Sequence, residues 1–357
     1  MTTDFTPARP RTRLRVRSAD GININVEVHG PDDAPTVVLI HGWTCSIRFW
    51  DPVINLLPDL RVVAYDQRGH GGSDLPGHGH YSVQALVDDL DAVLTKTLAP
   101  HQTAILAGHS MGGMTIMAAA LSESVMERTS AAVLASTGFA NLTQGARIVP
   151  FAAKSPRLGA YLQRRILHSP LPLGRVTPLA IAALKYGTLS PTATKEVATA
   201  TAAIVHACPR QSRAKWGHVL ATLDLAAGVH ALTVPTTVLV GTRDRLTPPP
   251  HAHAIAAALP NCQGLTELPN VGHMTPLEVP DTVAALIRSH LPAPTPSTPD
   301  APTALISFPP PPTSAAPAPT PTLPTPATAT VLTPTSSLSP ATPVPTPAGG
   351  SRRVQRA

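Results

Sequence analysis

The chain has 357 residues, of which 43% are hydrophobic, and this is enough for a large buried core. Its three cysteines show no CxxC spacing, which argues against a disulfide framework or a cysteine zinc site and favours a reducing compartment. The start of the chain lacks the apolar run of a signal peptide, and no segment is apolar over the length of a transmembrane helix, so we expect a cytoplasmic protein.

A β-hairpin is predicted near the start of the chain. Residues 13–30 alternate apolar and polar side chains on either side of Asp20 and Gly21, which is typical of two strands joined by a tight turn. Arginines occupy alternate positions from Arg9 to Arg17. Because charge on an edge strand blocks pairing with other sheets, we interpret them as a solvent-facing edge and expect no nucleic-acid partner.

Short, continuous, β-branched runs follow the hairpin and indicate strands buried on both faces. Helical patterns over residues 82–98, 111–121 and 281–291 lie between or after them. This alternation predicts an α/β fold with a mostly parallel central sheet, an antiparallel N-terminal hairpin and helices on both faces. The predicted strands cover residues 36–40, 61–66, 103–107, 131–136 and 236–241.

The segment between the last two of these strands is too long for a simple crossover. Its roughly 100 residues are rich in Ala and Leu at helical spacing, which predicts an inserted helical cap. Residues 139–223 carry eleven Lys and Arg side chains and one acidic residue, Glu196. Two interpretations of this charge stay open. Either solvated helix faces display it, or it steers anionic substrates or makes weak contact with an anionic membrane surface.

The C-terminal part of the chain has a different composition. Nineteen of the 42 prolines fall in residues 291–357, among Ala, Thr and Ser. Such a segment buries too little apolar surface to offset its ordering entropy, so we predict a disordered tail. It acts either as a flexible spacer or as a ligand for SH3-like partners, and its sequence identifies no particular partner.

A candidate nucleophile stands in the G-x-S-x-G motif at residues 108–112. Ser110 lies between the strand at 103–107 and the helix at 111–121. A strand-to-helix turn this sharp strains the serine backbone and exposes its hydroxyl, while the glycines let strand and helix approach. We expect the side chain of His109, inside this turn, to point away from the nucleophile's pocket.

A nucleophilic serine needs a base and a carboxylate that orients the base. On a sheet of this kind the chain order is serine, acid, histidine. Asp244 follows the buried run at 236–241, and His273 follows a glycine shortly before the last predicted helix. We therefore predict a catalytic triad of Ser110, Asp244 and His273.

Acyl transfer also needs donors for the oxyanion. We predict the backbone N–H of Met111, directly after Ser110, and that of Trp43, in the first strand-to-helix loop. His41, at the start of that loop, is interpreted as a side chain that braces it. This chemistry requires no metal and no organic cofactor.

Four segments carry a family resemblance: "LIHGWTCSIRFWDPVINLLPDLRVVAYDQRGHGGSD", "AGHSMGGM", "VLVGTRDRLTPP" and "LPNVGHM". Over about residues 13–290 the chain resembles the α/β-hydrolase superfamily, in its serine esterase, haloperoxidase-like and C–C hydrolase branches. The resemblance implies that the inserted segment is the cap over the active site. Epoxide hydrolases and haloalkane dehalogenases are also similar, but they use an aspartate as nucleophile, and position 110 is serine.

The sequence thus predicts a carboxylesterase-like or lipase-like hydrolase that cleaves a small-molecule ester or thioester, with lipid and anionic substrates both open. C–C bond hydrolysis and perhydrolase or haloperoxidase-type activity use the same triad. A ligand-binding or scaffold protein with an idle triad is the alternative outside enzymes. The predicted organisation is a flexible N-terminus (1–12), the hydrolase core (13–138), the basic cap (139–230), the rest of the core (231–291) and the disordered tail (292–357).

Overall fold

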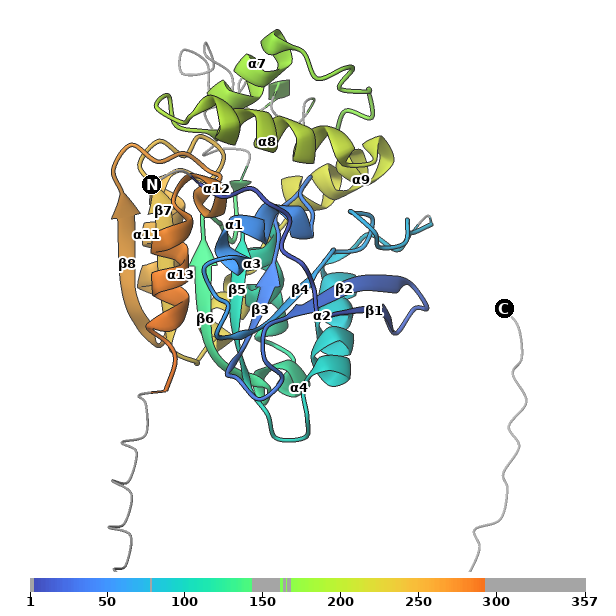
Figure 1. The fold of residues 1–357 in the computed structure, drawn as a ribbon, viewed down its shortest axis with the longest axis vertical. Coiled ribbons are helices and arrows are strands. Elements are labelled where there is room, and N and C mark those ends of the chain that lie inside the picture. Colours follow the sequence, from blue (N-terminus) through green and yellow to red (C-terminus); the bar gives the residue numbers. More distant parts are fainter. Residues whose placement is uncertain (1–2, 78, 143–160, 163–164, 166–167, 293–357) are drawn as a thin grey trace, which may run out of the picture. The chain divides into compact units, whose positions relative to one another are not determined.

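The computed structural model describes residues 3–77, 79–142, 161–162, 165 and 168–292. The predicted disordered tail lies outside these residues, apart from Pro292, and so does part of the predicted cap. Figure 1 shows the described part of the chain.

The described strands form one eight-stranded sheet in the order β1-β2-β4-β3-β5-β6-β7-β8. Strand β2 is antiparallel to both of its neighbours, and every other neighbouring pair is parallel. This confirms the predicted sheet with its antiparallel N-terminal hairpin. The strands are β1 (Thr12–Arg17), β2 (Asn23–His29), β3 (Thr36–Ile40), β4 (Arg61–Tyr65), β5 (Ala104–His109), β6 (Thr129–Ala135), β7 (Thr236–Gly241) and β8 (Cys262–Leu268).

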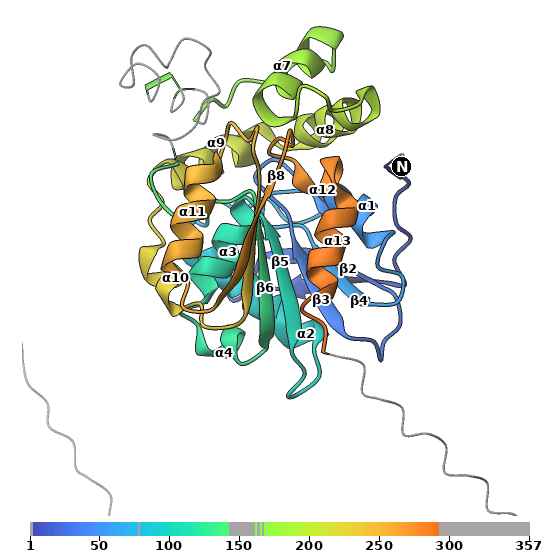
Figure 2. The same ribbon diagram turned by 90° about the vertical axis from the view of Figure 1, so that its left-hand side faces the viewer.

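Helices cover both faces of this sheet (Figure 2). In the described residues they are η1 (Ile47–Trp50), α1 (Asp51–Ile54), α2 (Val83–Thr97), α3 (Met111–Ala119), α4 (Glu123–Met126), α10 (Ala226–Ala231), α11 (Pro249–Ala258), α12 (Thr275–Glu278) and α13 (Pro280–Arg288). Three more helices lie between β6 and β7 in the chain and gather at one end of the sheet: α7 (Pro178–Thr188), α8 (Lys195–Ala207) and α9 (Arg210–Ala221). No described helix combines the length and the apolarity needed to cross a bilayer.

The central strands are buried on both faces. In β3, Val38 and Ile40 belong to the core that α2 and α3 cover, whereas Val37 and Leu39 belong to the opposite core under α1 and α13. Such strands have no solvent face, so they show continuous apolar runs rather than alternation.

The edge strand β8 was not predicted. Its residues are intermediate or exposed throughout, and Gly264 within it has φ 151°. Its sequence, CQGLTEL, has neither the continuous apolar run nor the strict alternation that marks strands in a sequence.

Helix α3 packs so closely against the sheet that glycine is needed both at the end of β5 and in the first turn of the helix. A Cβ atom on Gly112 would lie 2.1 Å from the carbonyl oxygen of Ile40, and one on Gly108 would lie 2.5 Å from the backbone of Gly112. Between them Ser110 adopts φ 50° and ψ −115°, a region that residues with a side chain rarely occupy. The surrounding backbone contacts therefore hold Ser110 in a strained conformation.

We predict that Gly112→Ala lowers the free energy of unfolding by about 2 kcal/mol or more, because the added methyl group meets fixed backbone. Gly77→Ala is the matched control, since a Cβ there has only His80 Cδ2 within 4 Å, at 3.9 Å. Urea denaturation of both variants measures the difference. Equal stability of the two variants would contradict the close packing of α3.

Candidate active site

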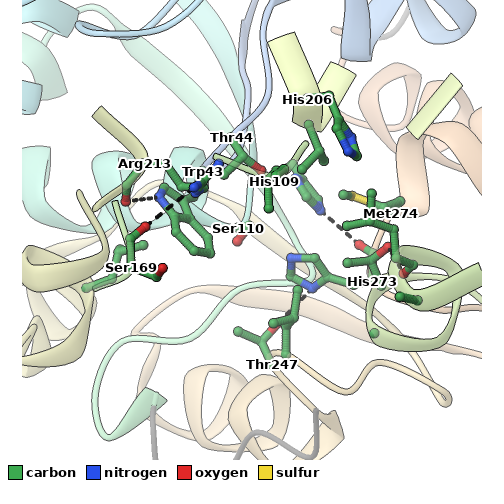
Figure 3. A pocket seen from close by; sticks show the side chains of 18 of the residues that line it. Trp43, Thr44, His109, Ser110, Ser169, His206, Arg213, Thr247, His273 and Met274 are labelled. Carbon is green, nitrogen blue, oxygen red and sulfur yellow. Dashed lines mark hydrogen bonds between the residues drawn. The ribbon is translucent and has the colours of Figure 1, made fainter. Parts of the chain in front are cut away.

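Ser110 lies at the end of β5 on the wall of a cavity of about 530 Å³ (Figure 3). Its N–H donates to the carbonyl oxygen of Ala135 over 2.9 Å, and its own carbonyl oxygen accepts from Thr137 Oγ1 over 2.7 Å. The end of β6 therefore holds the turn in place. The described lining is mostly apolar: Trp43, Met114, Leu142, Leu171, Pro172, Leu173, Ala180, Ala183, Leu184, Val205, Leu220, Leu246 and Met274.

Asp244 and His273 form a buried pair beside Ser110. The His273 Nδ1–H donates to Asp244 Oδ2 over 2.8 Å, and each residue is only 3% exposed. Asp244 also accepts from the N–H groups of Leu246 (2.8 Å) and Thr247 (2.9 Å) and from the Thr247 hydroxyl (3.0 Å). These bonds hold the carboxylate in one orientation. Because the carboxylate keeps a proton on Nδ1 of His273, Nε2 is left as an acceptor.

The structure places all three predicted triad residues at one site. Ser110 and His273 line the same cavity, and Asp244 is hydrogen-bonded to Nδ1 of His273. Among the hydrogen bonds between described residues, none joins the Ser110 hydroxyl to the His273 ring. Such bonds are often long in a free enzyme and shorten when the substrate is bound. One of the two side-chain contacts expected of a triad is therefore formed.

The backbone of His273 is held from two sides. Its N–H donates to the carbonyl oxygen of Thr188 at the end of α7, and its carbonyl oxygen accepts from His109 Nε2, both over 2.8 Å. The expectation that His109 points away from the pocket is wrong, because the residue is among those that line the cavity and its ring centroid lies 4.8 Å from that of His273. The physical reason is that the buried His273 carbonyl needs a donor. Burial lowers the pKa of His109 well below its usual value, so its ring is neutral.

A second carboxylate supports the same loop. Glu278 accepts from the N–H of Ser190 over 2.8 Å, and the N–H of Gly272 reaches both of its oxygens at 3.1 Å. Ser190 follows α7, so Glu278 ties the inserted segment to the loop that carries His273. Sequence reasoning missed Glu278, Thr188 and Thr247, since each acts through a contact that only the folded chain creates.

The predicted oxyanion donors lie next to Ser110. A Cβ on Gly42 would lie 3.1 Å from Ser110 Cβ, so the loop that carries Trp43 passes directly beside the serine. Met111 is the first residue of α3, and helix-starting N–H groups have no partner within the helix. Within the described residues, neither Trp43 N–H nor Met111 N–H donates to another group. Both donors are therefore available to a ligand.

Two buried histidines brace this loop. His41 donates from Nδ1 to the Gly42 carbonyl oxygen (2.8 Å) and accepts at Nε2 from the Gln67 N–H (3.0 Å), as expected of a bracing side chain. His70 Nε2 accepts from the Thr44 N–H over 3.3 Å. Burial lowers the pKa of His41 to about 4 and that of His70 to about 3. Both rings therefore act as neutral hydrogen-bonding groups at neutral pH.

Comparison with known sequences places these features in a family. The profile of a family described as "Alpha/beta hydrolase family" matches residues 37–286. The chain belongs to the alpha/beta hydrolase family. Among solved structures, the esterase RhEst1 from a Rhodococcus species has a TM-score of 0.63 and 23% sequence identity. The match covers 78% of this chain and 97% of that chain, which shows that the two share the hydrolase fold.

Two curated relatives match over shorter stretches of about 100 residues. The "bifunctional esterase/perhydrolase DCH" of Acinetobacter calcoaceticus is 39% identical over 100 residues, which are 28% of this chain and 35% of DCH. The "probable oxidoreductase EphD" of Mycobacterium tuberculosis is 38% identical over 110 residues, which are 30% of this chain and 18% of EphD. The chain therefore spans a minor part of the length of these relatives.

The neutral state of His41 predicts a pH dependence of stability. Its pKa is lower in the folded chain than in the unfolded one, so its contribution is complete above the unfolded pKa of about 6.5 and is lost as pH falls toward 4. Near pH 5 the wild-type chain takes up close to one proton at His41 when it unfolds, and the His41→Gln variant should lack this uptake. Between pH 5.5 and 4.5 the stability of the variant should fall less steeply than that of the wild type, by about 1 kcal/mol per pH unit.

Urea denaturation at several pH values measures these slopes, and His101→Gln is the control because its side chain is exposed. Parallel slopes for His41→Gln and the wild type would show that His41 is not held neutral in the folded state.

Proposed function

We propose that the protein is a serine hydrolase that cleaves a carboxylic ester or thioester through an acyl-enzyme. The observation that carries the proposal is the buried, hydrogen-bonded Asp244–His273 pair beside Ser110. The backbone of Ser110 is itself strained at the turn between strand and helix. A histidine with its proton fixed on Nδ1 is equipped to take a proton at Nε2. Membership of the alpha/beta hydrolase family supports this chemistry.

In the first step, His273 Nε2 takes the proton of the Ser110 hydroxyl while Oγ bonds to the carbonyl carbon. The carbonyl oxygen becomes negatively charged and accepts from the N–H groups of Trp43 and Met111. The tetrahedral intermediate then breaks its bond to the leaving alcohol, which takes the proton from His273. The products of this step are the free alcohol and an ester of Ser110.

In the second step, water replaces the alcohol. His273 takes one proton from water, the hydroxide oxygen attacks the acyl carbon, and Ser110 leaves with the proton that His273 returns. Asp244 keeps its negative charge throughout, orients the ring and stabilises the imidazolium that forms twice in the cycle. The net reaction consumes one water and releases one acid and one alcohol.

Perhydrolysis is a second candidate, because DCH is named as both an esterase and a perhydrolase. In that reaction hydrogen peroxide replaces water in the second step, and the acyl group leaves as a peroxy acid. The first step is unchanged, so the two activities require the same residues. Addition of hydrogen peroxide to the ester assay, with detection of peroxy acid, separates them.

We predict that the protein hydrolyses p-nitrophenyl esters and that Ser110→Ala lowers kcat/KM by at least about 10⁴-fold. Asp244→Asn should lower it by about 10³- to 10⁴-fold, because the amide no longer fixes the proton on Nδ1 of His273. The assay covers acyl chains from acetate to palmitate, and the preferred length measures the space over Ser110.

Ser289→Ala is the control for these variants, since Ser289 is exposed and its hydroxyl donates to a carbonyl at the end of α13. Full activity of a folded Ser110→Ala protein, or no turnover of any ester by the folded wild type, would rule out the proposed esterase.

A further inference from the structure

Arg213 on α9 is the one permanently charged side chain among the described residues that line the cavity. The residue is only 6% exposed. Its Nη2 donates to the backbone carbonyl oxygens of Leu171 and Ser169, the latter over 3.4 Å (Figure 3). Within the described residues, its Nε and Nη1 make no hydrogen bond. Part of this guanidinium is therefore available to a ligand in the cavity.

The inserted segment, residues 139–230, holds two carboxylates, those of Glu196 and Asp224, and the side chains of both are exposed. Arg213 forms no ion pair with any described residue, whereas the buried Arg68 pairs with Asp89 (2.6 Å) and Asp20 (2.7 Å). A buried cation without a negatively charged partner is unfavourable. Burial accordingly lowers the pKa of Arg213.

Three hydrogen bonds fix α9, and with it Arg213, on the core. The indole N–H of Trp216 donates to the Arg68 carbonyl oxygen (3.1 Å), and the hydroxyls of Tyr81 and Ser212 bond over 2.9 Å. The indole N–H of Trp43 donates to the carbonyl oxygen of Arg213 itself over 3.0 Å. The predicted oxyanion loop thus contacts the backbone of Arg213, while the carbonyl oxygens of Leu171 and Ser169 hold its guanidinium.

We propose that Arg213 binds a carboxylate carried by the substrate, away from the bond that is cleaved. The preferred substrates are then esters with one negative charge, such as half-esters of dicarboxylic acids, whose aliphatic part lies against the apolar wall. A guanidinium pairs with a carboxylate through parallel, charge-assisted hydrogen bonds, and this supplies the missing partner of Arg213. The inference rests on the proposed ester hydrolysis and names its substrate class.

The test compares three pairs of p-nitrophenyl esters with equal numbers of acyl carbons: the glutarate half-ester with pentanoate, the adipate half-ester with hexanoate, and the suberate half-ester with octanoate. In at least one pair, kcat/KM for the half-ester should exceed that for the neutral ester by at least about tenfold. Arg213→Gln should lower this ratio by at least about tenfold, and Arg213→Lys should keep part of it.

Arg210→Gln is the matched control, because Arg210 is an exposed arginine on the same helix, and it should leave both the ratio and the turnover of neutral esters unchanged. Circular dichroism and thermal melting establish that each variant is folded. Ratios near one for the wild type in all three pairs, or a ratio that Arg213→Gln and Arg210→Gln lower equally, would overturn the carboxylate site.

A binding experiment separates this inference from the proposed function. In the Ser110→Ala background, calorimetry should show that monomethyl adipate binds at least about tenfold more tightly than methyl hexanoate and that Arg213→Gln removes the difference. If no ester is cleaved but this binding holds, the esterase fails and the carboxylate site stands. If esters are cleaved through Ser110 but neither experiment shows a dependence on Arg213, the esterase stands and the carboxylate site fails.

Discussion

The close packing of α3 against the end of β3 sets the geometry around Ser110. Gly112 meets the carbonyl oxygen of Ile40 with no room for a side chain, so the chain must turn from β5 into α3 within one residue. That residue is Ser110, and the turn gives it a positive φ of 50°. The hydroxyl thereby lies at the cavity wall, directly before the N–H of Met111, which makes no hydrogen bond within the described part of the chain. The strained conformation of Ser110 persists because backbone atoms pack against backbone atoms on both sides of it.

Parallel strands bring the remaining residues to the same place. The loops that carry Asp244 and His273 follow β7 and β8, whose carboxyl ends lie at the same edge of the sheet as the end of β5. Ligands in open α/β sheets bind at this edge. The parallel strands alone therefore bring Asp244 and His273, which are distant from Ser110 in sequence, close to it in space.

The inserted segment lines the cavity and also holds the loop that carries His273. Thr188 accepts from the backbone of His273, and Ser190 shares Glu278 with the neighbouring Gly272. The segment therefore helps to set the position of the histidine ring, so changes in it should affect the chemical step as well as the choice of substrate. At its other end, α9 contacts the core through Trp216 and the loop of Trp43 through the Arg213 backbone.

Local patterns in the sequence predicted most of the sheet correctly, and they also selected the three residues that we propose as catalytic. Strands buried on both faces are continuous apolar runs, and the glycines around Ser110 mark a turn that few other residues tolerate. Asp244 and His273 could be selected because chain order and position after a strand or glycine are visible in a sequence.

The features that sequence reasoning missed depend on packing between distant segments. The residues of strand β8, CQGLTEL, form neither an apolar run nor a strict alternation, and only their pairing with β7 makes them a strand. The direction of the His109 ring follows from the buried carbonyl of His273, 164 residues away. The scarcity of acidic residues in residues 139–223 suggests that an arginine there lacks an ion-pair partner. The sequence does not indicate that Arg213 is the arginine that lines the cavity.

Covalent labelling can identify the nucleophile, which we propose is Ser110. A fluorophosphonate forms a stable bond with an activated serine, and mass spectrometry of the digested protein locates it. We expect one adduct per chain, on Ser110, formed far more slowly in the Asp244→Asn protein. An adduct on another residue, or a folded wild-type protein that stays unlabelled, would contradict it.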